Sequence, residues 1–299
     1  MFKKVCIIGC GLIGSSIARA IKEQNLSNKI VSSNRSDSIN KKVIELKIVD
    51  DSSSDTKKMT EGSDLVVIAT PLSSYEDVIL KIKNSLKEGC ILTDVSSVKE
   101  KIVNLIEKNI PKNVSWISSH PIAGTEESGP QAGFSELFKS RWCILTPSKK
   151  ANDKDIKLLE VFWKKIGCKV DIMDPKQHDY ILSITSHMPH LIAYNIVDTT
   201  LNAQDKKESD IVKYSAGGLR DFTRIAASNP IMWRDIFIQN KKNTSDMINN
   251  FIANLEDLKK AIENEDKKKL EAIFTKTKNI RKEIIKAGQD VEKPDFGRK

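Results

Sequence analysis

The sequence lacks the features of a membrane or secreted protein. None of its apolar runs approaches the roughly 20 residues that a membrane-spanning helix needs. The first residues lead into an apolar stretch, as in a short signal peptide, but glycines interrupt this stretch and no small-residue cleavage site follows. We therefore interpret the stretch as a first β-strand and expect a cytoplasmic protein.

Cysteine and histidine are too few and too scattered for a disulfide framework or a metal centre. The five cysteines form no CxxC pair, and an odd number cannot pair completely. The four histidines show no spacing typical of metal ligands. We predict no structural metal and no disulfide.

Long blocks of one charge are also absent, although the net charge is +9. The lysines are interleaved with acidic residues, as in the stretch 263–271. This pattern favours an ordinary solvated surface over a nucleic-acid-binding face. A positive field of this kind also attracts an anionic cofactor and an anionic substrate.

The first half of the chain alternates strand-like and helix-like segments, and this alternation predicts a parallel sheet with helices on both faces. The predicted strands are Lys4–Ile8, Lys29–Ser33, Asp64–Ala69, Cys90–Asp94 and Trp116–Ser118, and the first helix is Leu12–Gln24. The segments Cys143–Thr146, Asp153–Ile166 (a helix) and Lys169–Met173 extend the same layer.

After about Pro175 the strand pattern ends and helical periodicity replaces it. Such long, rather apolar helices often bury one face against a second subunit, so we expect a homodimer. The predicted helical segments are Gln177–Ala203, Pro230–Asn264 and Asp266–Ala287, with a glycine-containing break at Ala216–Arg224.

A glycine motif directly follows the first predicted strand. Gly9, Gly11 and Gly14 match GxGxxG between that strand and a helix. In this setting the first glycine permits a tight turn, the second lets a pyrophosphate approach the backbone, and the third allows close helix–strand packing. Leu12 and Ile13 begin the helix, whose free N–H groups face the phosphates. We predict a nicotinamide dinucleotide site; the alternative is a glycine-rich turn without a ligand.

The residues after the second strand favour NADP over NAD. An NAD enzyme usually carries Asp or Glu there, to bind the ribose 2′-hydroxyl. This chain carries no carboxylate at that point, and Arg35 offers a charge to pair with a 2′-phosphate. Asp37, one turn further on, is the alternative ribose ligand. The predicted cofactor contacts here are Ser33, Asn34, Arg35 and Ser36.

Polar residues follow three further strands. Thr70 and Pro71 come after the strand at 64–69, Ser97 after the strand at 90–94, and His120 after the strand at 116–118. Ligands of open α/β sheets bind at these carboxyl ends. A lone histidine is more often structural, but this position favours a site. Ser97 also reads as a helix N-cap, with Glu100 three residues later in a capping-box pattern.

Five longer motifs occur in a fixed order along the chain. They are Asp-x-x-Ser-Val-Lys at 94–99, His-Pro-Ile-Ala-Gly-Thr-Glu at 120–126, Ser-His-Met-Pro-His at 186–190, Asp-Phe-Thr-Arg-Ile-Ala at 221–226 and Pro-Ile-Met-Trp-Arg-Asp at 230–235. Together they resemble the prephenate/arogenate (cyclohexadienyl) dehydrogenases of tyrosine biosynthesis. The resemblance implies an α/β Rossmann-type domain with a mainly parallel sheet, residues 1–174, followed by an all-helical substrate and dimerisation domain, residues 175–299.

The resemblance also implies a reaction and the residues that perform it. In this family hydride leaves C4 of a cyclohexadienol for NAD(P), the C4 hydroxyl loses its proton, and the ring carboxylate departs as CO2. His120 matches the catalytic histidine, and Ser97 matches the serine beside it. Arg224 matches the arginine that binds substrate carboxylate, and His190 matches a second histidine that contacts substrate. The residues that match pocket-lining positions are Thr125, Glu126 and Trp233.

Other interpretations of these residues stay open at this point. Arg224 could brace the helical domain, Trp233 could be a core residue, and we expect His178 to be a surface or packing residue. His187 and His190 share one helix face, as a metal-binding pair would, but no third ligand is evident.

The alternative enzyme is a 3-hydroxyacid or 6-phosphogluconate type of dehydrogenase. Such enzymes place a catalytic lysine in the helical domain, and Lys241 and Lys242 lie in no matching setting. A non-catalytic NADP-sensing protein is the third possibility. The choice between prephenate and arogenate is not readable from the sequence.

Overall fold

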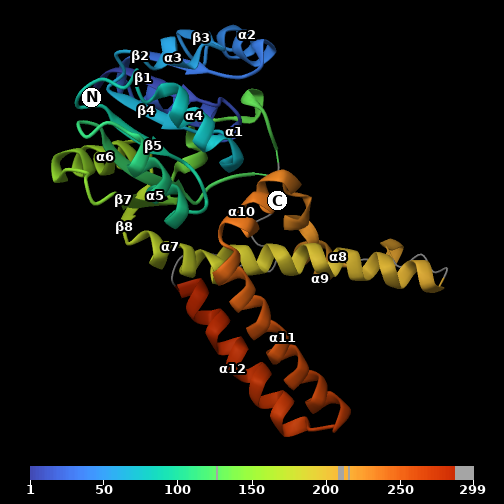
Figure 1. The fold of residues 1–299 in the computed structure, drawn as a ribbon. Helices are drawn as coiled ribbons and strands as arrows, with labels where there is room; N and C mark the ends of the chain where they lie inside the picture. The colour runs from blue at the N-terminus through green and yellow to red at the C-terminus, as the bar shows by residue number, and fades with distance from the viewer. Residues whose placement is uncertain (126, 208–211, 215, 287–299) are drawn as a thin grey trace. The chain divides into compact units, whose positions relative to one another are not determined.

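The computed structural model describes residues 1–125, 127–207, 212–214 and 216–286. The N-terminal part contains an eight-stranded sheet in the order β3-β2-β1-β4-β5-β6-β7-β8 (Figure 1). Strands β2 and β3 are added on one side of β1, and β4 and the later strands are added on its other side. All neighbouring strands are parallel except β6 and β7, which confirms the predicted mainly parallel sheet. The strands are β1 Phe2–Ile8, β2 Ser27–Ser33, β3 Asp51–Ser53, β4 Leu65–Ile68, β5 Ile91–Asp94, β6 Ser115–Pro121, β7 Trp142–Pro147 and β8 Lys169–Ile172.

Strand β3 was not among the predicted strands. Its three residues, Asp-Ser-Ser, carry no apolar side chain and therefore give no periodicity to read. It forms because its backbone pairs with β2 at the edge of the sheet, where polar side chains remain partly solvated.

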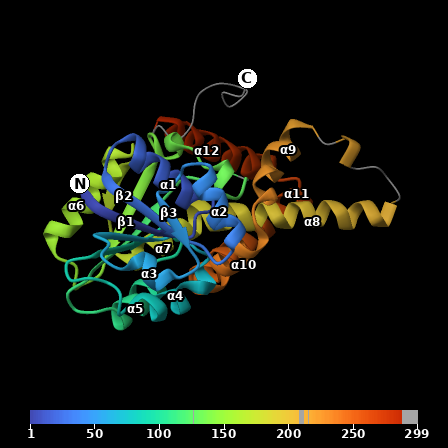
Figure 2. The same cartoon turned by 90° about the horizontal axis from the view of Figure 1, so that it is seen from above.

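Six helices cover the two faces of the sheet (Figure 2). The side chains of β1 alternate between these faces, and both faces are buried. Val5 and Ile7 pack on the side of α1, α2 and α6, whereas Cys6 and Ile8 pack on the side of α3, α4 and α5. The helices are α1 Leu12–Glu23, α2 Asp37–Glu45, α3 Thr56–Thr60, α4 Tyr75–Ile82, α5 Glu100–Asn109 and α6 Asp153–Lys165.

The turn between β1 and α1 needs its glycines for two different steric reasons. Gly9 has φ of 94°, in the left-handed region, and a Cβ there would lie 2.7 Å from the carbonyl oxygen of Ala69. A Cβ on Gly14 would lie 2.1 Å from the carbonyl oxygen of Gly9. The absence of a side chain at Gly14 therefore lets α1 pack directly on the end of β1.

The segment after Pro175 is helical, as predicted, but its breaks differ from those expected. The predicted helix 177–203 is interrupted by a π-helical turn at Ser183–His187. The predicted break at 216–224 is wrong, because that stretch forms α9 and a following 3₁₀ turn at Arg224–Ala227. The helices are α7 Pro175–Leu182, α8 Met188–Lys207, α9 Gly217–Thr223, α10 Pro230–Gln239, α11 Lys241–Glu263 and α12 Lys267–Lys286.

The chain forms two compact units, Met1–Thr244 and a second that begins at Ser245. The predicted domain boundary at 174/175 thus falls inside the first unit, at the start of α7. In the second unit α11 and α12 form an antiparallel hairpin, which an ion pair between Lys269 and Asp257 bridges at 2.5 Å (Figure 1). Within the described residues, no helix is both long and apolar enough to cross a membrane.

The Gly14 contact predicts a specific loss of stability. Gly14→Ala should lower the free energy of unfolding by about 1–3 kcal/mol, because the new methyl group meets backbone that cannot give way. Gly11→Ala is the matched control, since a Cβ there has no heavy atom within 4 Å, and its stability should stay within about 0.5 kcal/mol of the parent chain. Urea denaturation measures both, and equal stability of the two variants would contradict this account.

Candidate active site

The carboxyl ends of β1, β4, β5 and β6 meet at one edge of the sheet, because these neighbouring strands are parallel. The predicted site residues Gly11, Thr70, Ser97 and His120 follow or end these four strands. Strand order reverses between β1 and β4, which is where open α/β sheets form their ligand crevice. The topology therefore gathers segments that are far apart in sequence.

The turn from β1 to α1 fits a dinucleotide pyrophosphate. A Cβ at Gly11 would meet no heavy atom within 4 Å, so its backbone faces open space. No side chain among the described residues caps α1 at Gly11, which leaves the first-turn N–H groups, including those of Leu12 and Ile13, for an anion. Thr70 lies against Gly9 on the far side of this turn, and Pro71 is exposed beside it.

The predicted ribose contacts divide into two kinds. The Ser33 hydroxyl is buried and donates to Thr56 Oγ1 at 2.9 Å. Asn34 is buried too, and its Oδ1 accepts the backbone N–H of Cys10 at 2.6 Å. The Asn34 side chain therefore supports the glycine turn from within, whereas that of Ser33 bonds to the first residue of α3. Arg35 and Ser36 are exposed and remain available to a ligand at the end of β2.

His120 lies near the end of β6 with only 7% of its surface exposed. Its Nδ1 lies 2.9 Å from Nε2 of His178. Burial holds the pKa of His120 well below its usual value, and the nearby positive charge of Lys99 acts in the same direction. The imidazole is therefore neutral at pH 7, the state in which it can accept a proton.

His178 lies beside His120, a contact that the sequence did not reveal. Of the two expected positions, surface or packing, the structure excludes the surface, because His178 is fully buried between His120 and Asp179. Its Nδ1 lies 2.8 Å from Oδ1 of Asp179. Burial lowers the pKa of His178, although the Asp179 carboxylate opposes this shift. Nothing in its local sequence marks this contact, which joins residues 58 positions apart.

Asp179 also caps α5, a role that the sequence pattern assigned to Ser97. Its Oδ1 accepts the backbone N–H of Lys99 at 2.8 Å, and its Oδ2 accepts that of Glu100 at 3.0 Å. The predicted capping box at Ser97 is therefore wrong, because α5 begins only at Glu100 and takes its cap from a residue 80 positions further along. Ser97 is half-buried, and its hydroxyl has no hydrogen bond to any other described residue.

Lys99 is a buried cation beneath His120. Its Nζ lies 3.1 Å from both carboxylate oxygens of Asp94 and donates to Ser118 Oγ at 2.9 Å and to the Ser119 carbonyl at 2.6 Å. Burial lowers the pKa of Lys99, while the carboxylate of Asp94 favours its charged form. The ammonium thus ties β5 to β6 directly before His120.

Two further histidines lie where the π-helical turn meets α8: His187 ends the turn, and His190 is in the first turn of α8. His190 stacks on Trp233 with ring centroids 3.8 Å apart, and its Nδ1 lies 2.9 Å from the Ser186 carbonyl. His187 is buried, lies 3.1 Å from Nδ2 of Asn240, and has its pKa lowered to about 4, chiefly by burial. π-Turns of this kind are frequent at functional sites.

Helix α10 joins this region to the carboxyl edge of the sheet. Trp233 and Ile236 pack against Val98 of the β5–α5 loop and against Leu72 after β4. The indole N–H of Trp233 is buried without a hydrogen-bond partner in the described part of the chain. Trp233 therefore packs in the core and also contacts the ring of His190. No group of three His, Cys, Asp or Glu among the described residues is arranged to hold a metal ion.

Two of the remaining predicted residues, Arg224 and Thr125, are exposed. Burial lowers the pKa of His190, and the positive charge of Arg224 acts weakly in the same direction. Thr125 is exposed, and its hydroxyl accepts the backbone N–H of Glu127 at 3.2 Å. Glu126 lies outside the described residues.

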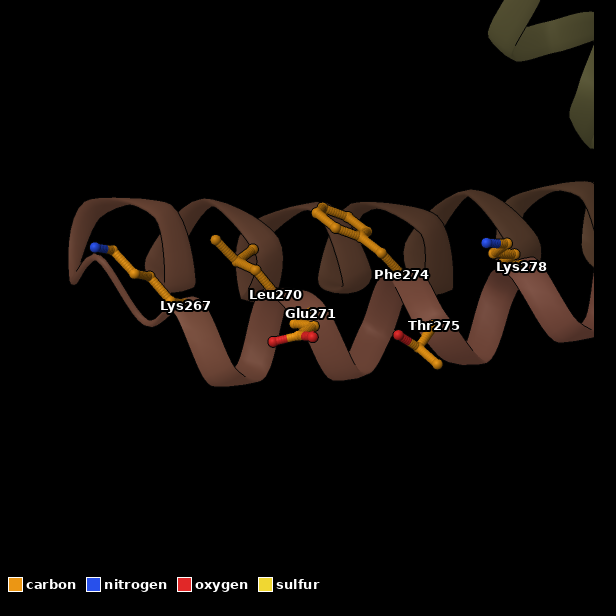
Figure 3. Close-up of a pocket in the computed structure, with 6 residues that line it drawn as sticks. All are labelled: Lys267, Leu270, Glu271, Phe274, Thr275 and Lys278. Carbon is orange, nitrogen blue, oxygen red and sulfur yellow. The ribbon is translucent and has the colours of Figure 1, made fainter.

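A shallow groove on α12 in the second unit contains none of the predicted site residues (Figure 3). Apolar and charged side chains alternate along it, and Figure 3 shows them on one side of the helix. They are Lys267, Leu270, Glu271, Phe274, Thr275 and Lys278.

Two family descriptions match almost the whole chain. Residues 17–172 match the nucleotide-binding domain of prephenate dehydrogenase, and residues 174–276 match its dimerization domain. The cyclohexadienyl dehydrogenase of Zymomonas mobilis is 35% identical over 89% of this chain and 90% of its own length. The prephenate dehydrogenase of Bacillus subtilis is 31% identical over 93% of this chain and 75% of its own length.

Solved structures agree with these relatives. The prephenate dehydrogenase of Aquifex aeolicus, crystallised with hydroxyphenyl propionate and NAD+, is 34% identical and superposes with a TM-score of 0.89 over 95% of this chain and 99% of that one. Synechocystis arogenate dehydrogenase, 23% identical, shares the fold with a TM-score of 0.79 over 94% and 99% of the two chains. The predicted fold class, enzyme class and nicotinamide cofactor are confirmed, and the chain belongs to the prephenate dehydrogenase family of NAD(P)-dependent oxidoreductases.

Proposed function

We propose that this chain converts prephenate or arogenate, by oxidative decarboxylation, into 4-hydroxyphenylpyruvate or tyrosine. The observation that carries the proposal is His120, a buried neutral base at the end of β6, on the sheet edge where the glycine turn offers a dinucleotide site. The names of the relatives from Z. mobilis and B. subtilis support this substrate class.

The chemistry requires few protein groups. The oxidised nicotinamide, when bound, accepts hydride from C4 of the substrate. His120 accepts the proton of the C4 hydroxyl, which a neutral imidazole can do at pH 7. The ring carboxylate leaves as CO2, the electron pair of the broken C–C bond completes the aromatic ring, and the ring oxygen takes the proton back from His120. Aromatisation drives the reaction, so the protein mainly orients the substrate and holds one base.

The other residues bind and orient. Arg224 binds a substrate carboxylate through its planar, permanently charged fork. His190, fixed by its stack on Trp233, contacts the substrate from the helical side. The Ser97 hydroxyl has no partner among the described residues. We therefore assign it a hydrogen bond beside His120 and the nicotinamide. Thr125, which is exposed, lines the entrance to the pocket.

Steady-state assays at the absorbance band of the reduced nicotinamide test the reaction itself. Prephenate and arogenate are offered separately to the same preparation, since they differ only in a keto-acid or amino-acid side chain. Reduction of the nicotinamide with either substrate supports the proposal, and its absence with both refutes it.

His120→Asn should lower kcat by roughly 10²–10⁴-fold, the usual contribution of a general base. The nicotinamide should still bind with unchanged affinity, because the glycine turn is not altered; quenching of tryptophan fluorescence on titration measures this. A turnover number within twofold of the parent enzyme would contradict the role of His120.

Arg224→Ala should mainly raise KM, because it removes a charge that pairs with the substrate carboxylate in the ground state and transition state alike. Arg141→Ala, at an exposed position beside β7, is the matched control and should leave KM unchanged. A loss of kcat with KM intact would argue against carboxylate binding by Arg224.

We further propose that NADP is preferred over NAD. The end of β2 carries no carboxylate, Ser33 and Asn34 are committed to internal hydrogen bonds, and Arg35 and Ser36 are exposed. Arg35 then pairs with the 2′-phosphate, and Ser36 donates to it from the start of α2. The A. aeolicus relative was crystallised with NAD+. A preference for NADP would therefore distinguish this enzyme from a relative that binds NAD+, and both cofactors should be measured with it.

This preference predicts a charge-specific effect. Arg35→Ala should raise KM for NADP by about tenfold or more, the loss of one strong charge-assisted contact, and leave KM for NAD unchanged. Lys41→Ala, at an exposed position further along α2, controls for the general positive field. Equal kcat/KM for the two cofactors in the parent enzyme would refute the preference.

We also propose that the enzyme is a cytoplasmic homodimer, with residues 1–174 binding the dinucleotide and residues 175–299 completing the substrate site and the subunit contact. The match to a dimerization domain supports this assembly. So do the large apolar side chains exposed on α11 and α12, which are Ile252, Leu255, Ile262, Phe274, Ile280 and Ile284. Five buried free thiols suit a reducing compartment.

A further inference from the structure

A continuous chain of buried hydrogen bonds runs from His120 through His178 to Asp179. The two links measure 2.9 Å, from His120 Nδ1 to His178 Nε2, and 2.8 Å, from His178 Nδ1 to Asp179 Oδ1. The three side chains belong to the same compact unit and are almost completely enclosed. None of the proposed substrate contacts involves His178 or Asp179.

The direction of each hydrogen bond follows from the last member of the chain. The carboxylate of Asp179 also accepts the backbone N–H groups of Lys99 and Glu100. An ionised carboxylate only accepts, so Nδ1 of His178 must donate its hydrogen to Oδ1. Burial lowers the pKa of His178, so the ring is neutral and carries this one hydrogen. Its Nε2 is then an acceptor, and His120 must donate from Nδ1.

We propose that His178, anchored by Asp179, is a positioning residue that fixes His120 in the tautomer whose Nε2 carries the lone pair. The substrate proton then arrives at Nε2 while Nδ1–H stays bonded to His178, and the imidazolium so formed faces an acceptor backed by a carboxylate. No proton passes to Asp179. The part of this proposal that concerns catalysis rests on the function proposed above for His120. The assignment of the His120 tautomer does not rest on it.

The other two histidines provide internal references for this inference. Nδ1 of His190 faces the carbonyl oxygen of Ser186, which only accepts, so His190 also carries its hydrogen on Nδ1. Nδ2 of Asn240 donates to the carbonyl oxygen of Asp179 at 2.8 Å, which fixes the amide orientation. Nδ1 of His187 therefore accepts from the same amide, and His187 carries its hydrogen on Nε2.

Nitrogen NMR of the full-length enzyme labelled with ¹⁵N-histidine tests the tautomer without any substrate. The chain has four histidines, so four pairs of ring nitrogens appear, and single substitutions assign them. At pH 7.5 we expect His120, His178 and His190 to be protonated on Nδ1 and His187 on Nε2. Protonation of His120 on Nε2 would overturn the inference.

Kinetics of two substitutions test the positioning role. His178→Phe keeps the ring volume but removes the acceptor, and should lower kcat by about 10²-fold or more with KM changed less than about threefold. His178→Gln supplies a carbonyl acceptor towards His120 and an amide donor towards Asp179, and should restore kcat to within about tenfold of the parent. Tyr180→Phe, at an exposed position on the same helix, is the control and should match the parent.

These outcomes separate this inference from the proposed function. Failure of the parent enzyme to oxidise prephenate and arogenate refutes the function, and the NMR result still decides the tautomer. An active parent with unaltered kcat in His178→Phe overturns the positioning role. Equal losses in the Phe and Gln variants, with lowered thermal stability in both, would also overturn it, because they would show that His178 only fills space.

Discussion

The carboxylate of Asp179 is the interaction on which the arrangement of this site depends. It lies on α7, the first helix after the sheet, and its oxygens accept two backbone N–H groups at the start of α5 and the ring N–H of His178. One side chain therefore fixes the beginning of the helical segment against the carboxyl end of β5. The same contact sets the orientation of the ring next to His120. Because a capped helix terminus and a carboxylate favour each other electrostatically, this junction suits a position where geometry must be held closely.

Beneath this junction the protein buries a lysine and a carboxylate in a region without water access. Lys99 and Asp94 have fully buried side chains. Taking two charges out of water is costly, and a pair of this kind rarely adds net stability. It does impose geometry, because the ammonium must satisfy its donors on Ser118 and on the carbonyl of Ser119, the residue before His120. The cost of burying Lys99 and Asp94 is thus tied to the placement of the end of β6, where His120 lies.

The dinucleotide site and the surroundings of His120 are built by different physical means in this fold. The glycine turn offers backbone N–H groups and steric room, and the buried Asn34 supports it from behind through Cys10. The surroundings of His120 depend on side chains from four segments: the β5–α5 loop, the end of β6, the α7–α8 stretch with its π-turn, and α10. The dinucleotide site can be built within one βαβ unit. The surroundings of His120 form only when the helices after the sheet pack on the carboxyl edge of the sheet.

The sequence by itself determined the repeating pattern of strands and helices, the glycine turn and the family motifs that name His120, Arg224 and Trp233, because each of these is a local arrangement of residue types. It missed β3, whose polar residues pair only through the backbone, and it assigned the cap of α5 to the nearby Ser97. Only the tertiary structure decided that Asp179 caps α5 and that His178 lies beside His120. Those contacts join residues 80 and 58 positions apart, and local periodicity carries no information about which distant side chain will fill a hydrogen-bonding position.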